Sequence, residues 1–170
     1  MIKIKNKKGF LLAEETLKIV IALIALGFLV YFLTALYFAN INKQKLEQAE
    51  NSLTRIGEIF DGLAEGNFEV QDISNPKGWH LFSFVENVKP NSCAGENCIC
   101  ICSRVYDDPI RAIFVSWEER QAKECTDGGS CLIAENLGHF DEIKIKNTDE
   151  GLTQVLIKKE NNMVLMSEVK

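Results

Sequence analysis

The chain has 170 residues, with 19 Lys and Arg against 24 Asp and Glu, which gives a formal net charge of −5. With 46% hydrophobic and 25% charged residues, its composition is that of a folding chain and not of a disordered one. The length favours one principal domain plus one further element. A mildly acidic chain is not expected to bind nucleic acid, which requires a basic surface.

The longest apolar segment lies near the N-terminus. Residues 19–39, IVIALIALGFLVYFLTALYFA, are 21 uncharged residues, of which 13 are Ile, Leu, Val or Phe. A helix of this length extends about 32 Å, which matches a hydrocarbon core of roughly 30 Å. The segment is therefore predicted to span a membrane, since a buried soluble helix of this length would normally retain one polar face.

The charges that flank this segment predict its orientation. Residues 1–10 hold four lysines and no acid, whereas residues 40–50 hold two Lys and two Glu. The positive-inside rule then places the N-terminus in the cytoplasm and residues 40–170 outside the cell. A cleaved secretory signal is the alternative, but its apolar run would be shorter, and Tyr37 interrupts the small-residue pattern that ends at Ala39.

Ionisable residues lie within the first turns of the apolar helix, which is expected to begin at Phe10. Glu14, Glu15 and Lys18 occupy this region, where a charged side chain is costly and commonly marks a function. The structural alternative is that these side chains lie at the cytoplasmic interface and extend toward water. In that case Glu14 and Lys18, at positions i and i+4, are expected to pair within the helix.

A short motif precedes the apolar helix. Lys7-Lys8-Gly9 is followed by Phe10, and Glu14 is the fifth residue counted from Phe10. This spacing, directly before a membrane span, resembles the class III signal peptide of type IV pilins and pseudopilins, and the resemblance covers roughly residues 3–39. It implies that a membrane prepilin peptidase cuts between Gly9 and Phe10. It also implies that the glutamate pairs with the new amine of a neighbouring subunit in a filament.

Two features depart from the pattern of that family. Glu15 and Lys18 add charges where the family is mostly apolar, and Tyr31 lies where many bacterial pilins have a helix-bending Pro. After cleavage, the new amine and Lys18 would balance the two glutamates, so the cluster is neutral only with the amine included. Lys18 can also pair with Glu14 in the same helix, which leaves open which carboxylate meets a neighbouring subunit.

Beyond the membrane span the helix is predicted to continue, so that one helix covers residues 10–65. The extension over residues 41–65 contains no Pro, and Gly66 is a plausible end. Apolar residues spaced by three and four form a heptad-like seam: Leu46, Ala49, Leu53, Ile56, Phe60 and Leu63. The seam either packs against the chain's own β domain or bundles with helices of other subunits, and the pilin resemblance implies both uses.

After Asn67 the apolar residues alternate with a period of two, which predicts an antiparallel β-rich domain over residues 67–170. The candidate strands are Phe68–Ile73, His80–Val85, Cys98–Val105, Ile110–Trp117, Cys131–Glu135, His139–Lys146, Thr153–Lys159 and Met163–Glu168. Asn161-Asn162 indicates a hairpin between the last two. Glu118–Lys123 is ambiguous and is expected to form at most a short helical turn. The predicted fold class is α+β.

Six cysteines lie in this domain: Cys93, Cys98, Cys100, Cys102, Cys125 and Cys131. An even number on the outer side of a membrane predicts disulfides. Cys98, Cys100 and Cys102 alternate along one strand and project from one face about 6.6 Å apart, which disfavours bridges between them. Each of these three is therefore predicted to pair with one of the other three, which leaves six patterns.

The sequence indicates no further chemistry. Zinc sites favour C-x₂-C spacing, which does not occur, and the C-x-C-x-C run is a weaker metal-binding alternative to disulfides. His80 and His139 lie in strand patterns and are predicted to be surface or packed side chains. Without a phosphate-binding loop, a nucleophile elbow or a distinctive acid–base pair, the chain is predicted to have no metal, no cofactor and no enzymatic activity.

These features predict a pilin-like structural subunit of an extracellular filament or pseudopilus. Residues 1–9 would be the leader peptide, and the N-terminal helix would assemble in the membrane with copies of itself or related subunits after the prepilin peptidase has acted. The N-terminus would be cytoplasmic and the C-terminal domain extracellular. The alternative is an uncleaved single-pass membrane protein whose outer domain binds a partner and does not polymerise.

Overall fold

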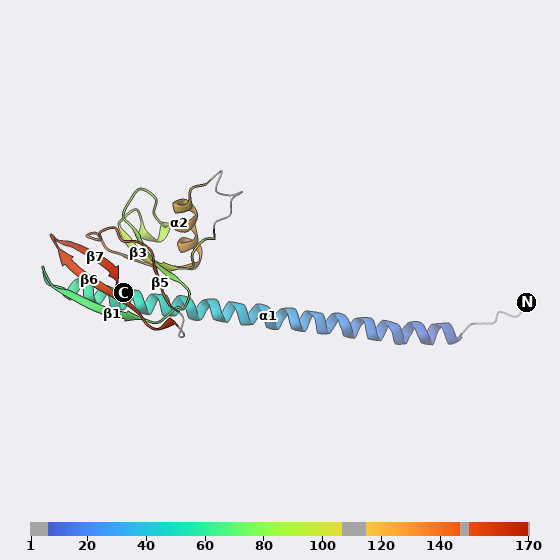
Figure 1. The fold of residues 1–170 in the computed structure, drawn as a ribbon. Helices are drawn as coiled ribbons and strands as arrows, with labels where there is room; N and C mark the ends of the chain where they lie inside the picture. The colour runs from blue at the N-terminus through green and yellow to red at the C-terminus, as the bar shows by residue number, and fades with distance from the viewer. Residues whose placement is uncertain (1–6, 107–114, 147–149, 170) are drawn as a thin grey trace, which may run out of the picture. The chain divides into compact units, whose positions relative to one another are not determined.

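The structure is a computed structural model that describes residues 7–106, 115–146 and 150–169, with side chains described from Glu15 onward. In these ranges a long helix precedes antiparallel strands and a shorter helix (Figure 1). The helices are α1 (Lys7–Gly62), the 3-10 helix η1 (Asn91–Cys93) and α2 (Trp117–Gly128). The strands are β1 (Phe68–Ile73), β2 (His80–Phe84), β3 (Cys98–Cys102), β4 (Ser130–Ile133), β5 (Ile143–Lys144), β6 (Thr153–Glu160) and β7 (Met163–Glu168). The predicted α+β fold class is confirmed.

α1 is an uninterrupted helix of 56 residues, and no Pro occurs between its ends. It ends at Gly62, three residues before the predicted end at Glu65. The Glu65 carboxylate instead accepts backbone N–H groups of Asn161-Asn162 in the β6–β7 turn, at 2.5 and 3.2 Å. Gly66 then adopts a φ of +80°, which reverses the chain into β1. Glu65 thus lies beyond the end of the helix and contacts the β6–β7 hairpin.

The strands pair in antiparallel fashion, as predicted, and they form two sheets. The three-stranded sheet has the order β1-β6-β7, and the four-stranded sheet has the order β4-β3-β2-β5. Asn161 and Asn162 both have positive φ in the turn between β6 and β7, which confirms the predicted hairpin. An isolated parallel bridge between Leu137 and Val164 joins the segment after β4 to β7.

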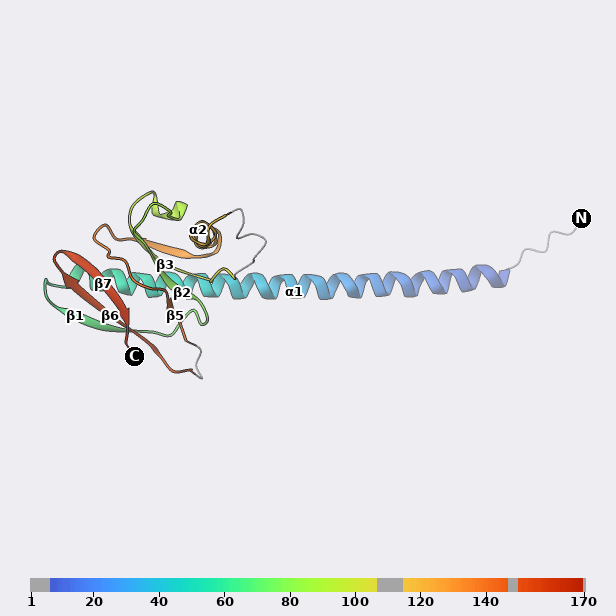
Figure 2. The same ribbon diagram turned by 45° about the horizontal axis from the view of Figure 1, so that its top comes forward.

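The chain divides into two compact units, Met1–Lys43 and Gln44–Lys170, with the boundary inside α1. In the second unit the last part of α1 packs against both sheets around one hydrophobic core (Figure 2). Its most buried members are Ala49, Ile56, Leu81, Ile99, Ile101, Ile145, Val155 and Ile157. The second unit therefore contains about five turns of α1 as well as the predicted β domain.

Two of the predicted strands are shorter by three or more residues in the structure. β3 ends at Cys102 and not at Val105, because the backbone N–H of Val105 donates to the side chain of Gln121 in α2. Of the predicted strand His139–Lys146, only Ile143–Lys144 forms β5. The loops that replace the missing strand residues contact α2 and β2, which a period-two pattern does not reveal.

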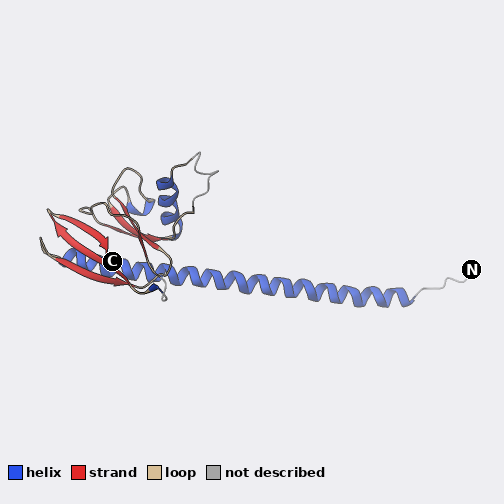
Figure 3. Cartoon of the chain, viewed as in Figure 1, coloured by secondary structure: helices blue, strands red, loops and turns tan. Residues whose placement is uncertain are grey.

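α2 replaces the end of another predicted strand. Residues 110–114 of the predicted strand Ile110–Trp117 lie outside the described residues, and Trp117 begins α2 (Figure 3). Ser116 is the N-cap, and its Oγ accepts a hydrogen bond from the backbone N–H three residues later at 3.2 Å. The short turn predicted at Glu118–Lys123 is therefore part of a helix of 12 residues.

Candidate functional site

The predicted processing site lies at the start of α1. The helix begins at Lys7, so Gly9 and Phe10 are both helical, and the helix does not begin at Phe10 as predicted. The side chains of Phe10 and Glu14 lie outside the described residues. Cleavage after Gly9 therefore stays a prediction, at a peptide bond within the first turn of α1.

Lys18 and Glu15 form an ion pair on the surface of α1. Lys18 Nζ lies 3.4 Å from Glu15 Oε1, and the two side chains are 60% and 72% exposed. The sequence predicted a pair between Lys18 and Glu14, which stays untested because the Glu14 side chain is not described. An exposed pair contributes little to stability in water, but near lipid it compensates two charges that are costly to desolvate.

The apolar side chains over residues 15–39 are exposed around α1. This helix is long and apolar enough to cross a membrane, and none of its most apolar window is buried. Phe28 and Tyr31, for example, are 70% and 73% exposed. Thr34 Oγ1 donates to the carbonyl oxygens of Val30 and Tyr31 at 2.9 and 2.8 Å, so its hydroxyl is satisfied within the helix. This part of α1 presents a surface suited to lipid or to other helices.

The predicted heptad seam divides into a buried part and an exposed residue. The buried seam residues are Ala49, Leu53, Ile56 and Leu63, with Phe60 partly buried. Leu46 is 40% exposed and lies outside the hydrophobic core. The seam from Ala49 onward therefore packs within the chain, which is the first of its two predicted uses. Leu46 is the seam residue that remains accessible to another helix.

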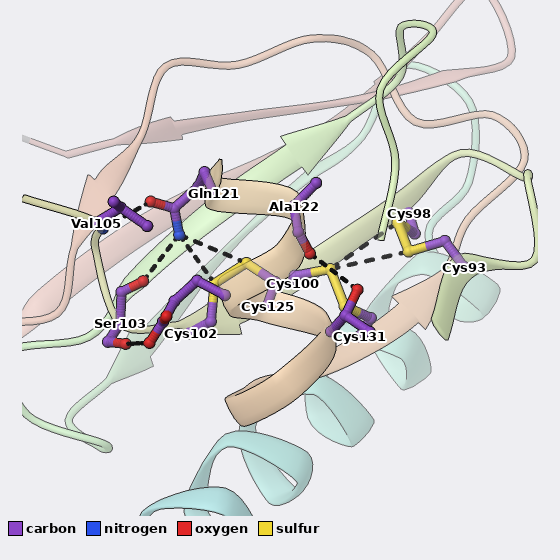
Figure 4. The surroundings of a disulfide bond; sticks show 12 residues. Cys93, Cys98, Cys100, Cys102, Ser103, Val105, Gln121, Ala122, Cys125 and Cys131 are labelled. Atoms are coloured by element: carbon purple, nitrogen blue, oxygen red, sulfur yellow. Dashed lines mark hydrogen bonds between the residues drawn. A yellow bond between two sulfur atoms is a disulfide. The ribbon is translucent and has the colours of Figure 1, made fainter. Parts of the chain in front are cut away.

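The six cysteines form three disulfides beside β3 (Figure 4). The pairs are Cys93–Cys98, Cys100–Cys131 and Cys102–Cys125. Each strand cysteine pairs with a cysteine outside the strand, which is one of the six predicted patterns. Ile99 and Ile101 face the core shared with α1, whereas the cysteines pack against aromatic side chains of β2 and against α2. β3 therefore separates the hydrophobic core that includes α1 from a disulfide-bonded layer.

Gln121 of α2 is a buried polar residue that the sequence pattern does not single out. Its Nε2 donates to the Ser103 carbonyl oxygen at 2.8 Å and lies 3.3 Å from Cys102 Sγ, while its Oε1 accepts from the Val105 N–H at 2.9 Å (Figure 4). These contacts hold the segment after β3 against α2, beside the Cys102–Cys125 disulfide. Gln is usually a surface residue, so only the three-dimensional contacts identify this role.

The sulfur atoms of Cys93, Cys98 and Cys100 lie within 4.8 Å of one another. Three thiolates at this spacing could hold a soft metal ion, because zinc sites use clustered cysteine sulfurs. All three sulfurs are in disulfides in the structure, so none is a thiolate. In the oxidised chain the arrangement therefore favours disulfide cross-linking over the metal-binding alternative.

The two histidines lie in different surroundings. Burial lowers the pKa of His80, in β2, below its ordinary value of 6.5. The negative charge of Glu142 opposes this lowering of the pKa, whereas the positive charges of Arg104 and Lys144 add to it. His139 is exposed in the segment before β5. His80 is therefore a packed strand residue that stays neutral at neutral pH.

Comparison with known proteins identifies no relative: no family model, no curated protein and no solved structure matches the chain. The structure is compatible with a pilin-like architecture at the level of a long apolar N-terminal helix followed by a disulfide-bonded antiparallel β domain.

Proposed function

We propose that this chain is a pilin-like structural subunit of an extracellular filament or pseudopilus. Its leader would be removed after Gly9 by a prepilin peptidase, and the new N-terminal helix would assemble with copies of itself or related subunits. The N-terminus would face the cytoplasm before assembly and the unit Gln44–Lys170 would lie outside the cell. This role is structural and requires no catalytic residue, cofactor, metal or nucleic acid.

The observation that carries the proposal is the contrast along α1. From Ala49 to Leu63 the seam is buried against the chain's own sheets, whereas residues 15–39 expose apolar side chains all round the helix. A membrane anchor needs only about 20 apolar residues and no helical continuation into a folded domain. In α1 one part of a continuous helix belongs to a folded unit and another part is exposed. This arrangement suits a filament subunit, because the exposed part could lie in the membrane before assembly and contact the helices of other subunits after it.

The charges at the head of α1 give the proposal a second support. Lys18 pairs with Glu15, and Glu14 is the residue at the spacing that the pilin motif requires. Cleavage after Gly9 would create an amine at Phe10, so that two positive groups would balance the two carboxylates of the cluster. A neutral cluster is less costly to bury between helices than one with an excess charge.

Photo-cross-linking tests whether the exposed part of α1 meets other subunits. A photoreactive phenylalanine analogue at Phe28 is expected to produce a ladder of cross-linked copies in cells that contain the peptidase. The matched control carries the same analogue together with Gly9→Val, which removes the glycine of the predicted processing site, and is expected to remain unprocessed and monomeric. A fully processed chain that yields no ladder contradicts assembly through α1.

The uncleaved single-pass membrane protein remains the second candidate function. The Lys18–Glu15 ion pair favours it, because this pair compensates two charges without a neighbouring subunit. Glu14→Ala distinguishes the two functions when membrane insertion is measured alongside assembly. If Glu14→Ala abolishes assembly and leaves membrane insertion normal, the filament is supported. If both the wild type and the variant insert normally and neither assembles, the single-pass alternative is supported.

A further inference from the structure

A cavity of about 890 Å³ lies against α2, the start of β2, the segment after β3, and β5. Its volume is in the range of small-molecule binding sites. Most of the residues that line it are polar or charged, and the side chains that matter here are Arg104, Tyr106, Arg120, Lys123, Glu124 and Asp127. The proposed filament role uses none of these residues.

Arg120 contributes a buried donor that has no acceptor in the described part of the chain. Its Nη1 donates to the Tyr106 carbonyl oxygen at 3.5 Å, which is long for a hydrogen bond. Its Nε is buried and makes no hydrogen bond with residues 7–106, 115–146 or 150–169. On the β2 side of the cavity, His80 Nδ1 is a second buried nitrogen without a partner in the same ranges. Buried donors and acceptors are normally satisfied, so these atoms favour a bound polar molecule.

The charged groups around the cavity differ in whether they already have partners. Arg104 pairs with Glu142 at 3.3 Å and Lys144 pairs with Glu150 at 3.1 Å, so these two cations are compensated. Glu124 accepts a hydrogen bond from the Ser103 hydroxyl. Of the charged residues of α2 that line the cavity, Arg120, Lys123 and Asp127 can therefore still bind a ligand.

Those three groups lie on one face of α2. Arg120, Lys123 and Asp127 are spaced by three and four residues, and all three line the cavity. Lys123 is exposed and forms no ion pair with another described residue. Tyr106 is 92% exposed, so one face of its ring is free for stacking. The site thus combines two neighbouring cations, Arg120 and Lys123, with a carboxylate acceptor and an exposed aromatic ring.

We propose that this cavity binds an acidic saccharide. The sugar carboxylate accepts hydrogen bonds from the Arg120 guanidinium and Lys123 Nζ, and a ring hydroxyl donates to the Asp127 carboxylate. The apolar face of the sugar ring lies on Tyr106. An acidic peptide fits less well, because it offers no ring hydroxyl to donate to Asp127 and no sugar ring face to lie on Tyr106. The site would let the outer unit recognise anionic glycans, whether or not the chain assembles.

Calorimetric titration of the full-length protein tests this inference. The protein is held in micelles of a detergent without a sugar headgroup and titrated with trigalacturonic acid, with neutral galactotriose as the matched ligand. Saturable binding of the acidic trisaccharide alone is expected. Arg120→Gln is expected to weaken it about tenfold or more, since a hydrogen bond to a charged group is lost. Arg55→Gln, an exposed arginine of α1 outside the cavity, is the control and is expected to bind as the wild type does.

A second variant guards against misfolding. Lys123→Gln changes an exposed side chain, so the disulfides and the tryptophan fluorescence should be unchanged while binding weakens several-fold. Equal binding of the neutral and acidic trisaccharides overturns the inference, as does unchanged affinity in both cavity variants. Tighter binding of triglutamate than of trigalacturonic acid would reassign the site to acidic peptides and also overturn it. None of these outcomes depends on filament assembly.

Discussion

Cys100 of β3 and Cys131 of β4 lie directly opposite each other in the antiparallel register and are joined by a disulfide. The bridge connects residues 31 apart in sequence and fastens the edge strand β4 to the sheet. Cys93 and Cys98, in contrast, are only 5 apart. In the chain-entropy model a bridge that closes a longer loop restricts the unfolded chain more, so the two bridges should differ in their contributions to stability.

Paired substitutions test this difference. Cys100→Ala with Cys131→Ala is expected to lower the free energy of unfolding by about 3–4 kcal/mol, and Cys93→Ala with Cys98→Ala by about 2 kcal/mol. Urea titration of the full-length protein in micelles, followed by the fluorescence of Trp79 and Trp117, measures both. A larger loss on removing the Cys93–Cys98 bridge would contradict the entropic account.

The divided seam of α1 predicts two different responses to the same chemical change. Ile56 is fully buried, so Ile56→Ala is expected to lower the free energy of unfolding by about 2–5 kcal/mol. Leu46 is 40% exposed, and Leu46→Ala is expected to change the free energy of unfolding by no more than about 0.5 kcal/mol. The same urea titration measures both. Similar losses at the two positions would mean that the seam packs within the chain along its whole length.

Gln121 is expected to hold the segment after β3 in place. Gln121→Leu leaves the Val105 N–H and the Ser103 carbonyl without their partners, which should lower the free energy of unfolding by about 2–3 kcal/mol. Hydrogen–deuterium exchange at the Val105 amide should accelerate as well. Glu118→Gln, on the exposed side of α2, is the control. Unchanged protection of Val105 in the leucine variant would show that another acceptor serves this amide.

His80 predicts a pH dependence of stability. Because burial lowers its pKa in the folded chain below 6.5, the unfolded chain binds a proton first as the pH falls. The free energy of unfolding should therefore decrease from pH 6.5 downward until the folded chain is also protonated, and His80 should have no such effect above that pH. His80→Gln should remove this part of the decrease, whereas His139→Gln should retain it. Parallel pH profiles for the wild type and His80→Gln would refute the assignment.

The faces of β3 could be predicted from sequence because alternation is a local property. Once Cys98–Cys102 is a strand, Ile99 must point away from its cysteine neighbours, and the structure shows this arrangement. The hairpin at Asn161-Asn162 was predictable for a similar reason, since Asn tolerates positive φ. The choice among the six disulfide patterns could not be predicted from the sequence, because it depends on where α2 and β4 lie in space.

The extent of α2 and the cavity beside it could not be read from the sequence. Trp117 continues an apolar alternation that predicts a strand, but the Ser116 cap and the contacts of Gln121 make it the start of a helix. Arg120 looks like an ordinary surface arginine in the sequence. Only the three-dimensional structure, in which α2 packs against the segment that follows β3, shows that its Nε is buried without a hydrogen-bond partner among the described residues.

The mature N-terminal residue tests the central claim most directly. Intact-mass measurement of the protein extracted from cells with an active prepilin peptidase should give a chain that begins at Phe10. The Gly9→Val variant from the same cells should keep its leader. A wild-type chain that still begins at Met1 under these conditions would contradict the pilin-like role and leave a membrane-anchored protein with a disulfide-bonded outer unit.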